Sequence, residues 1–171
     1  MKHTRKNPAT TVDIVVMRSH KEKVEILFIQ RKNPPFQGNW ALPGGFVEMD
    51  ETCLTAAHRE LEEETSLKGL SLQPLGIFDK VDRDPRGRTI SMVYWTILVA
   101  PNKAKASSDA ADAHWFAIDS LPSLAFDHLD IIVSLKRQMS LYSCALPLLD
   151  AAPEMKAKNI KEILIPFLEK K

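Results

Sequence analysis

The segment from Gly45 to Leu67 constrains this chain more than any other, because it joins a Gly-Gly turn to a helix with three carboxylates on one face. If the residues from about Glu51 to Thr65 are helical, Glu60, Glu63 and Glu64 stand at i, i+3 and i+4. Like charges at that spacing destabilise a free helix. A hard dication reverses the effect, since Mg²⁺ and Mn²⁺ prefer carboxylate oxygens as ligands. The segment therefore predicts metal-assisted chemistry on a phosphate group.

The alternative is an acidic helix face that contacts only solvent, and the neighbouring residues argue against it. The turn Pro43–Gly45 lies just upstream, and Glu51 stands where the helix should begin. Arg59 lies four residues before Glu63, so that it can pair with this carboxylate and hold its orientation. These features favour an organised site over a solvated surface.

Written as a pattern, the segment reads G-x5-E-x7-R-E-U-x-E-E-x2-U, where U is apolar. It resembles the signature of the Nudix hydrolases, which cleave nucleoside diphosphates linked to another group. The departure is Ser66, where the family usually has glycine; a left-handed backbone there would cost about 1 kcal/mol. The resemblance implies an α/β fold, a Nudix-type α/β/α sandwich with a mixed β-sheet.

Hydrophobic periodicity along the rest of the chain predicts strands grouped around two or three helices. We expect one domain over residues 1–171, with a flexible lead over 1–10 and a C-terminal tail and helix over 143–171. In the first helix, Asp50 is the expected N-cap, and Leu54, Ala57 and Leu61, with Ala56 beside them, form the expected core stripe. The expected strands are 11–18, antiparallel to 24–31, then 40–42, 72–80, 89–100 and 114–118, and the expected helices are 51–65, 127–142 and 156–170.

Composition excludes several classes of partner. The chain has 23 basic and 22 acidic side chains, so no overall charge favours nucleic acid or a membrane surface. No stretch approaches the roughly 20 apolar residues of a membrane span. The isolated Cys53 and Cys144 provide neither a disulfide framework nor metal spacing. We expect a soluble, cytoplasmic protein that binds neither nucleic acid nor membrane.

A second motif concerns the substrate. The loop 82–88, DRDPRGR, holds three arginines, whose forked guanidinium groups suit phosphate oxygens. The alternative is a charged loop whose Asp and Arg residues pair with each other. Together with KNPPFQGNWALPGGFVE and LPSLAFDH, this loop resembles the ADP-ribose pyrophosphatase branch of the Nudix hydrolases. The resemblance implies hydrolysis of ADP-ribose to AMP and ribose 5-phosphate, and a possible homodimer.

The resemblance also implies roles for individual residues, which we state as expectations. Mg²⁺ or Mn²⁺ would be held by Glu60, Glu63, Glu64 and the Gly44 carbonyl, with Arg59 orienting a glutamate. Asp109 is a candidate base, or a solvated loop residue. Expected substrate-binding residues are Arg83, Arg86, Arg31, Trp40 and Gly45, although Trp40 could instead be a packing residue and Arg31 a surface residue. Asp127 is expected to cap the following helix, and the alternative is that Asp127 and His128 contact a ribose hydroxyl.

Two other functions remain open at this point. The enzyme could hydrolyse another nucleotide, such as an oxidised nucleoside triphosphate or a dinucleotide, because the glutamates handle phosphates and do not select the base. Related sequences also form the ADP-ribose-sensing domain of Nudix-type transcriptional regulators of NAD metabolism. Such regulators carry a winged-helix region after this domain, and we expect the roughly 30 residues after Leu141 to be too few for one.

Overall fold

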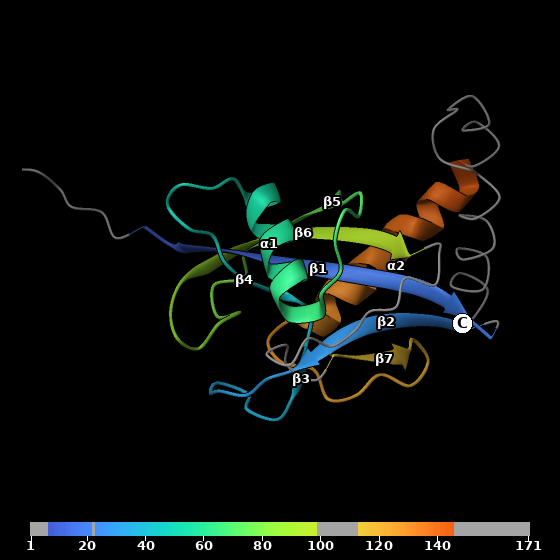
Figure 1. Ribbon diagram of the computed structural model, residues 1–171, viewed down its shortest axis with the longest axis horizontal. Coiled ribbons are helices and arrows are strands. Elements are labelled where there is room, and N and C mark those ends of the chain that lie inside the picture. The colour runs from blue at the N-terminus through green and yellow to red at the C-terminus, as the bar shows by residue number, and fades with distance from the viewer. Residues whose placement is uncertain (1–6, 22, 99–112, 146–171) are drawn as a thin grey trace, which may run out of the picture.

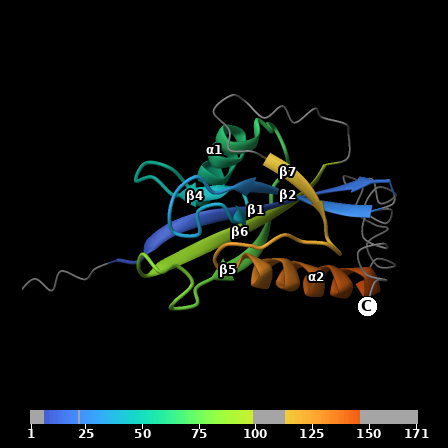
Figure 2. The same cartoon turned by 90° about the horizontal axis from the view of Figure 1, so that it is seen from below.

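The computed structural model describes residues 7–21, 23–98 and 113–145. These residues form a seven-stranded mixed sheet with one helix on each face (Figures 1 and 2). The hydrogen-bonded order is β3-β2-β1-β6-β5, with β4 added to β1 and β7 added to β2. The elements are β1 Ala9–His20, β2 Lys23–Gln30, β3 Trp40–Ala41, β4 Gly44–Phe46, α1 Cys53–Thr65, β5 Gln73–Phe78, β6 Thr89–Leu98, β7 Ala113–Ala117 and α2 His128–Ala145.

Strand β1 lies at the centre of the sheet and is apolar on both faces because both faces are covered. Its side chains alternate between two cores, as the period of two in a strand requires. Val15 and Met17 pack with the α2 residues Ile131 and Leu135. On the opposite face, Val12, Ile14 and Val16 pack with Ala57 and Leu61 of α1. The continuous apolar run in this part of the sequence therefore reflects a strand enclosed between two helices.

The sheet is mixed because β1 pairs in parallel with β6 and antiparallel with β2 and β4. The antiparallel pairing of β1 with β2 confirms the expected hairpin. β1 begins at Ala9, two residues inside the expected flexible lead, because Ala9 and Thr10 pair with the start of β6. The expected helix at 156–170 lies outside the described residues.

Helix α1 begins later than the acidic residues before it suggest. The expected N-cap Asp50 is wrong: Thr52 is the N-cap, and its hydroxyl oxygen accepts a hydrogen bond from Thr55 N at 3.2 Å. The expected core position Leu54 is also wrong, since it is 43% exposed, whereas Ala56, Ala57 and Leu61 are buried. The apolar residues of α1 that pack against the sheet are Cys53, Ala56, Ala57 and Leu61.

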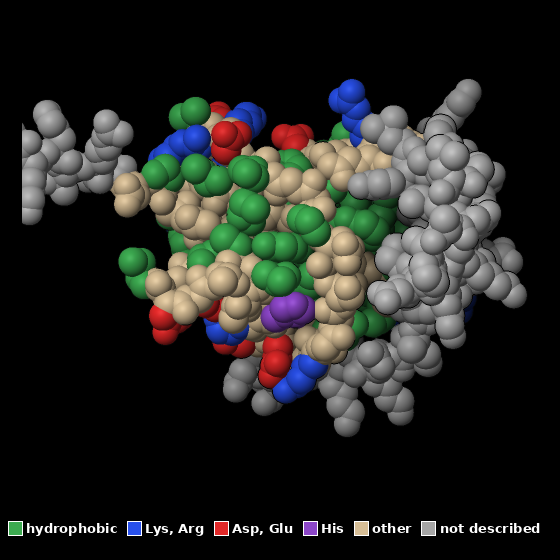
Figure 3. Space-filling model, turned by 90° about the horizontal axis from the view of Figure 1, so that it is seen from above, with side chains coloured by type: hydrophobic (Ala, Val, Ile, Leu, Met, Phe, Trp, Pro, Cys, Tyr) green, Lys and Arg blue, Asp and Glu red, His purple; other side chains and the backbone are tan. Residues whose placement is uncertain are grey.

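The described surface is mixed in charge. On the face seen from above, acidic and basic side chains are interspersed along the margins, around a centre of apolar and uncharged side chains (Figure 3). Among the described residues, no helix is sufficiently long and apolar to cross a membrane.

Candidate active site

Arg59 organises the acidic face of α1. Its Nη2 atom lies 2.6 Å from Glu51 Oε1 and donates to the Phe46 carbonyl at 3.1 Å. Its Nη1 atom lies 2.8 Å from Glu60 Oε1 and 3.4 Å from Glu63 Oε2. Glu51 also accepts a hydrogen bond from Glu48 N at 2.9 Å, which ties the loop before α1 to the helix. One guanidinium thus contacts two of the three glutamates and braces the loop that precedes them, and the spacing of Arg59 had predicted the contact with Glu63.

The glutamates differ in their surroundings. Glu63 is exposed, with 58% of its side-chain surface accessible. Burial raises the pKa of Glu60, against the opposing effect of Arg59. Burial raises the pKa of Glu64 further, to about 8, although its carboxylate accepts a hydrogen bond from Gly44 N at 2.8 Å. Two desolvated carboxylates and one exposed carboxylate therefore occupy neighbouring turns of a single helix.

Two glycines allow the turn after β3 to lie against both β1 and α1. Gly44 has φ +153°, and a Cβ atom there would collide with the Val12 carbonyl oxygen. A Cβ atom on Gly45 would collide with the Glu60 carboxylate. The absence of side chains lets the backbone of this turn approach the glutamates closely, which is the use of glycine at such sites.

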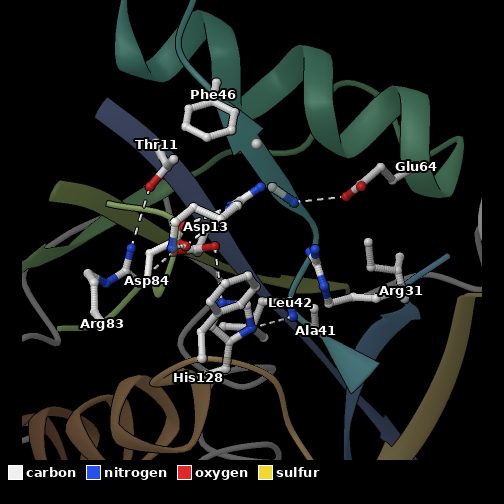
Figure 4. Close-up of a pocket in the computed structure, with 15 residues that line it drawn as sticks. Thr11, Asp13, Arg31, Ala41, Leu42, Phe46, Glu64, Arg83, Asp84 and His128 are labelled. Atoms are coloured by element: carbon white, nitrogen blue, oxygen red, sulfur yellow. Dashed lines mark hydrogen bonds and ion pairs between the residues drawn. The ribbon is translucent and has the colours of Figure 1, made fainter. Parts of the chain in front are cut away.

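A cavity of about 210 Å³ opens beside Glu64 (Figure 4). Its lining combines Glu64 from α1 with Arg31 at the end of β2, Arg86 from the loop before β6, and the aromatic rings of Phe46 and Phe126. A second hollow of about 350 Å³ is lined by residues 29–33 together with Glu60, Glu63 and Glu64. Arg31 and Glu64 belong to both hollows. The Arg31 guanidinium and the Glu64 carboxyl group therefore lie where the two hollows meet.

The arginines of the loop 82–88 have different roles in the structure. Arg83 is buried, with 5% of its side-chain surface accessible, and its Nη2 and Nε atoms contact the two Asp127 carboxylate oxygens at 2.7 and 3.0 Å. Arg86 has 45% of its side-chain surface accessible and pairs with Asp84 at 2.7 Å. Its guanidinium also lies over the Phe46 and Phe126 rings, 5.2 and 5.7 Å from their centroids. Arg86 therefore faces the cavity, whereas the donors of Arg83 point to buried aspartates.

Two further expected substrate residues lie in contrasting places. The Arg31 guanidinium lies 4.8 Å from the centroid of the Phe126 ring and donates to the Pro35 carbonyl at 2.7 Å. Burial and the charge of Arg86 lower the pKa of Arg31. The Trp40 ring instead packs edge-on against His114 and Phe116, with centroid distances of 5.2 and 4.8 Å, and belongs to the core beside α2. The structure thus places Arg31 in the cavity and Trp40 in the packing role that was its alternative.

A buried polar cluster that the sequence did not predict lines part of the cavity. Asp13 on β1 accepts a hydrogen bond from the Ser91 hydroxyl at 2.6 Å, and its carboxylate lies 3.2 Å from Arg83 Nη2. The His128 Nε2 atom lies 3.4 Å from the other Asp13 oxygen. Burial acts to raise the pKa of Asp13, but His128, Arg83 and Ser91 outweigh it and lower the pKa to about 2. The cluster connects β1, β6, the loop 82–88 and the start of α2.

This cluster had one signal in the sequence. Asp13 interrupts an otherwise apolar strand, and a charge in such a position must be paired to be buried. Its partners, Arg83 and His128, are 70 and 115 residues away (83 − 13 and 128 − 13), so the sequence could not identify them. Asp127 stands at the residue before α2, as expected of a cap, but its carboxylate oxygens accept hydrogen bonds from Arg83.

The residues of α1 fit a hard dication by their chemistry. Among the described residues, no three His, Cys, Asp or Glu side chains are gathered into a metal-binding group. Glu60 is turned to Arg59, and Glu64 is turned to Gly44 N. The donor set is nevertheless three carboxylates in two helical turns, and the desolvated Glu64 has the raised pKa that a bound dication would reverse. The expected base Asp109 lies outside the described residues.

Comparison with known proteins finds a matching family and several similar proteins. The NUDIX domain family matches residues 7–135. An ADP-ribose pyrophosphatase of Methanocaldococcus jannaschii is 46% identical over 126 residues, which cover 74% of this chain and 72% of that protein. The ADPR responsive transcriptional repressor NtrR of Acinetobacter baylyi is 32% identical over 130 residues, 74% of this chain and about half, 52%, of the repressor.

A solved structure is similar in fold as well as in sequence. It is a bifunctional NMN adenylyltransferase/ADP ribose pyrophosphatase from Francisella tularensis, complexed with AMP and a manganese ion. The TM-score is 0.66 at 34% identity, and the match covers 80% of this chain and 43% of that one.

Proposed function

This chain belongs to the Nudix family, and on that basis we propose that it is a metal-dependent hydrolase that cleaves the diphosphate of ADP-ribose to AMP and ribose 5-phosphate. The observation that carries the proposal is the meeting of Glu64 and Arg31 at the boundary of two hollows. A diphosphate between two bulky groups needs such a place, where carboxylates recruit a cation and an arginine faces the phosphate oxygens. The similarity to an ADP-ribose pyrophosphatase supports the choice of substrate.

In this proposal the carboxylates of Glu60, Glu63 and Glu64 and the Gly44 carbonyl would hold Mg²⁺ or Mn²⁺. The bound dication would neutralise the diphosphate and make an attacking water more acidic. Arg59 would keep Glu60 and Glu63 in place, because it already contacts both. A glutamate of α1 or Asp109 would accept the proton from the attacking water. Among the glutamates we favour Glu63, which is exposed and has the longest contact with Arg59.

The two hollows suggest how the substrate lies. Arg86 and Arg31 would hold phosphate oxygens from the side opposite the glutamates. Phe46, which is 47% exposed, would offer the adenine the ring face away from Arg86. The hollow at residues 29–33 contains polar and charged side chains, which suit the terminal ribose. Gly45 would contribute only backbone, because a side chain there would displace Glu60.

The test combines a substrate panel with one matched pair of variants. Nucleoside diphosphate sugars, dinucleotides and nucleoside triphosphates are incubated with Mg²⁺ or Mn²⁺, and released AMP and phosphate are measured. We expect ADP-ribose to be the preferred substrate. Strong turnover of an oxidised triphosphate with weak turnover of ADP-ribose would refute the substrate assignment, and the assignment as a hydrolase would stand.

The variant pair separates a catalytic carboxylate from a surface carboxylate. Glu63→Gln keeps the shape of the side chain and removes its charge, so we expect the rate to fall by roughly a hundredfold or more. Glu62→Gln changes the neighbouring residue, which is exposed and pairs with Lys68 at 2.6 Å, and should keep the wild-type rate. If Glu63→Gln were as active as Glu62→Gln, the metal and base assignments would be wrong.

The similarity to the repressor supports a second candidate, an ADP-ribose sensor that controls DNA binding. We favour the enzyme because Glu60, Glu63 and Glu64 are all retained on one face of α1, beside Arg31. A DNA gel shift with and without ADP-ribose distinguishes the two. A salt-sensitive shift without turnover would establish the sensor, and turnover without a shift would remove it.

A further inference from the structure

His128 makes a buried contact with the backbone that precedes the Gly44–Gly45 turn. Its Nδ1 atom accepts a hydrogen bond from Leu42 N at 2.9 Å, and its Nε2 atom lies 3.4 Å from Asp13 Oδ1 (Figure 4). The side chain is 4% exposed. Both ring nitrogens are thus engaged, so that the imidazole has no free lone pair with which to take a proton from a substrate, although it lines the cavity.

The hydrogen bond from Leu42 N to His128 stands where the pairing between β3 and the segment before α2 would otherwise continue. On its outer edge, β3 pairs with the segment before α2: Trp40 N donates to the Ser123 carbonyl at 3.1 Å, and Ala125 N donates to the Trp40 carbonyl at 2.8 Å. Leu42 N is the next donor along that edge, since alternate residues of an extended segment point the same way. Beside Leu42 the chain has already entered α2, and the Nδ1 atom of His128 accepts the hydrogen bond from Leu42 N in place of a backbone carbonyl.

The residues that follow Leu42 transmit this contact to the candidate active site. The Pro43 carbonyl accepts a hydrogen bond from Ile14 N at 2.8 Å, and Gly44 pairs with Asp13 across β1 and β4. Gly44 N then donates to Glu64 at 2.8 Å. The Asp13 carboxylate, which lies beside His128, is held in turn by Ser91 and Arg83. A short, hydrogen-bonded path therefore runs from the start of α2 to a glutamate of α1.

We propose that His128 is a positioning residue, which holds Leu42 in register and thereby sets where Gly44 meets Glu64. The role rests on the proposed function, because Gly44 and Glu64 are among the groups assigned to the dication. His128 acts through the backbone and does not contact the reacting atoms. The start of α2, on the opposite face of the sheet from α1, thus determines the geometry of the α1 carboxylates.

Two conservative variants separate the two contacts of the ring. An asparagine at 128 can present an oxygen where Nδ1 stands and so can accept from Leu42 N, but it does not reach Asp13. A glutamine can place its amide near the Nε2 position and donate to Asp13, but leaves Leu42 N without a partner. Each variant loses one contact, so that both should lower the urea midpoint of unfolding, and stability alone does not distinguish them.

The readout is Mn²⁺ affinity of the metal-free protein, measured by electron paramagnetic resonance of free Mn²⁺, together with kcat and KM for ADP-ribose. We expect His128→Gln to weaken Mn²⁺ binding and lower kcat by about tenfold or more, the size typical of losing a group that orients a metal ligand. His128→Asn should stay within about threefold of the wild type, and KM should change little in either. His20→Asn, in an exposed residue at the far end of β1, is the matched control.

Equal Mn²⁺ affinity in the two variants, or weaker binding in His128→Asn, would overturn the proposal. A wild-type protein that binds Mn²⁺ without hydrolysing ADP-ribose would refute the proposed function, and the Mn²⁺ comparison would still test His128. The tautomer supplies a measurement that needs no variant. Two-bond ¹⁵N–¹H correlations of the wild-type protein at pH 7 should show a proton on Nε2 alone, and a proton on Nδ1 would overturn the proposal.

Discussion

Replacement of Arg83 by alanine should destabilise the fold far more than it weakens substrate binding. Its side chain is 5% exposed, and its guanidinium contacts Asp127 through two hydrogen bonds and Asp13 through a third, at 3.2 Å. Arg83→Ala leaves the Asp127 and Asp13 carboxylates, 7% and 10% exposed, without the cation that compensates their burial. The variant therefore tests whether Arg83, in the loop 82–88, stabilises the fold or binds the substrate.

The magnitude follows from what is left unpaired. Removing one partner of a buried ion pair costs about 3–5 kcal/mol, because the remaining charge stays desolvated. Asp13 keeps its contacts with Ser91 and His128, which reduces the free-energy cost of leaving that carboxylate without Arg83. We therefore expect a loss of about 3 kcal/mol in the free energy of unfolding, toward the lower end of that range. For a protein of this size the melting temperature should fall by roughly 6–12 °C.

The assay compares Arg83→Ala with Arg86→Ala in the same loop. Urea unfolding followed by tryptophan fluorescence measures stability, and kinetics with ADP-ribose measures KM. Arg86→Ala, half-exposed at the cavity, should raise KM and cost less than about 1 kcal/mol of stability. The reasoning would be refuted if Arg83→Ala kept wild-type stability and raised KM, because Arg83 would then leave its aspartates to bind substrate.

Two further predictions concern stability. Ser66 ends α1 at φ 60° and ψ 13°, so Ser66→Gly should raise the free energy of unfolding in urea by about 1 kcal/mol, with Ser66→Ala as the unchanged control; an equal result for the two variants would contradict this. The folded-state pKa of Asp13 lies near 2, below its ordinary 3.8, so the unfolded chain binds the proton first as the pH falls. Asp13 should therefore contribute stability on the order of 2 kcal/mol above pH 5, and lose it between about pH 4 and pH 2. In urea titrations the difference between wild type and Asp13→Asn should shrink over that window, while Asp50→Asn, an exposed control, should follow the wild type; a constant difference would disprove the assignment.

The acidic segment illustrates how much of this site was predictable. The spacing of Arg59 from Glu63 predicted their ion pair, and the structure adds Glu51 and Glu60 to the same guanidinium. These contacts are local, within one helix and the loop before it, so that periodicity is sufficient to infer them. The left-handed backbone at Ser66 fits the glycine that the Nudix signature usually has at this position.

The loop arginines illustrate what was not predictable. Arg83 and Arg86 stand three residues apart in a Pro/Gly loop and look equivalent in sequence. The side chain of one is 5% exposed and that of the other 45%, because only Arg83 has Asp13 and Asp127 beneath it. The start of α1 was misplaced for a related reason. Asp50 and Thr52 are both good N-cap residues; Thr52 takes that position, and Glu51 between them binds Arg59.

By itself, the sequence determined a local arrangement of groups: three carboxylates on a helix, an arginine beside them and glycines in the segment just before the helix. Those features depend on spacings of a few residues, which helix and turn geometry convert directly into proximity. Only the tertiary structure decided what surrounds them. It buried Glu64, set Arg31 opposite, and joined Asp13, Arg83 and His128 from elements up to 115 residues apart. Burial and long-range pairing depend on how the two helices cover the sheet, and no local pattern contains that information.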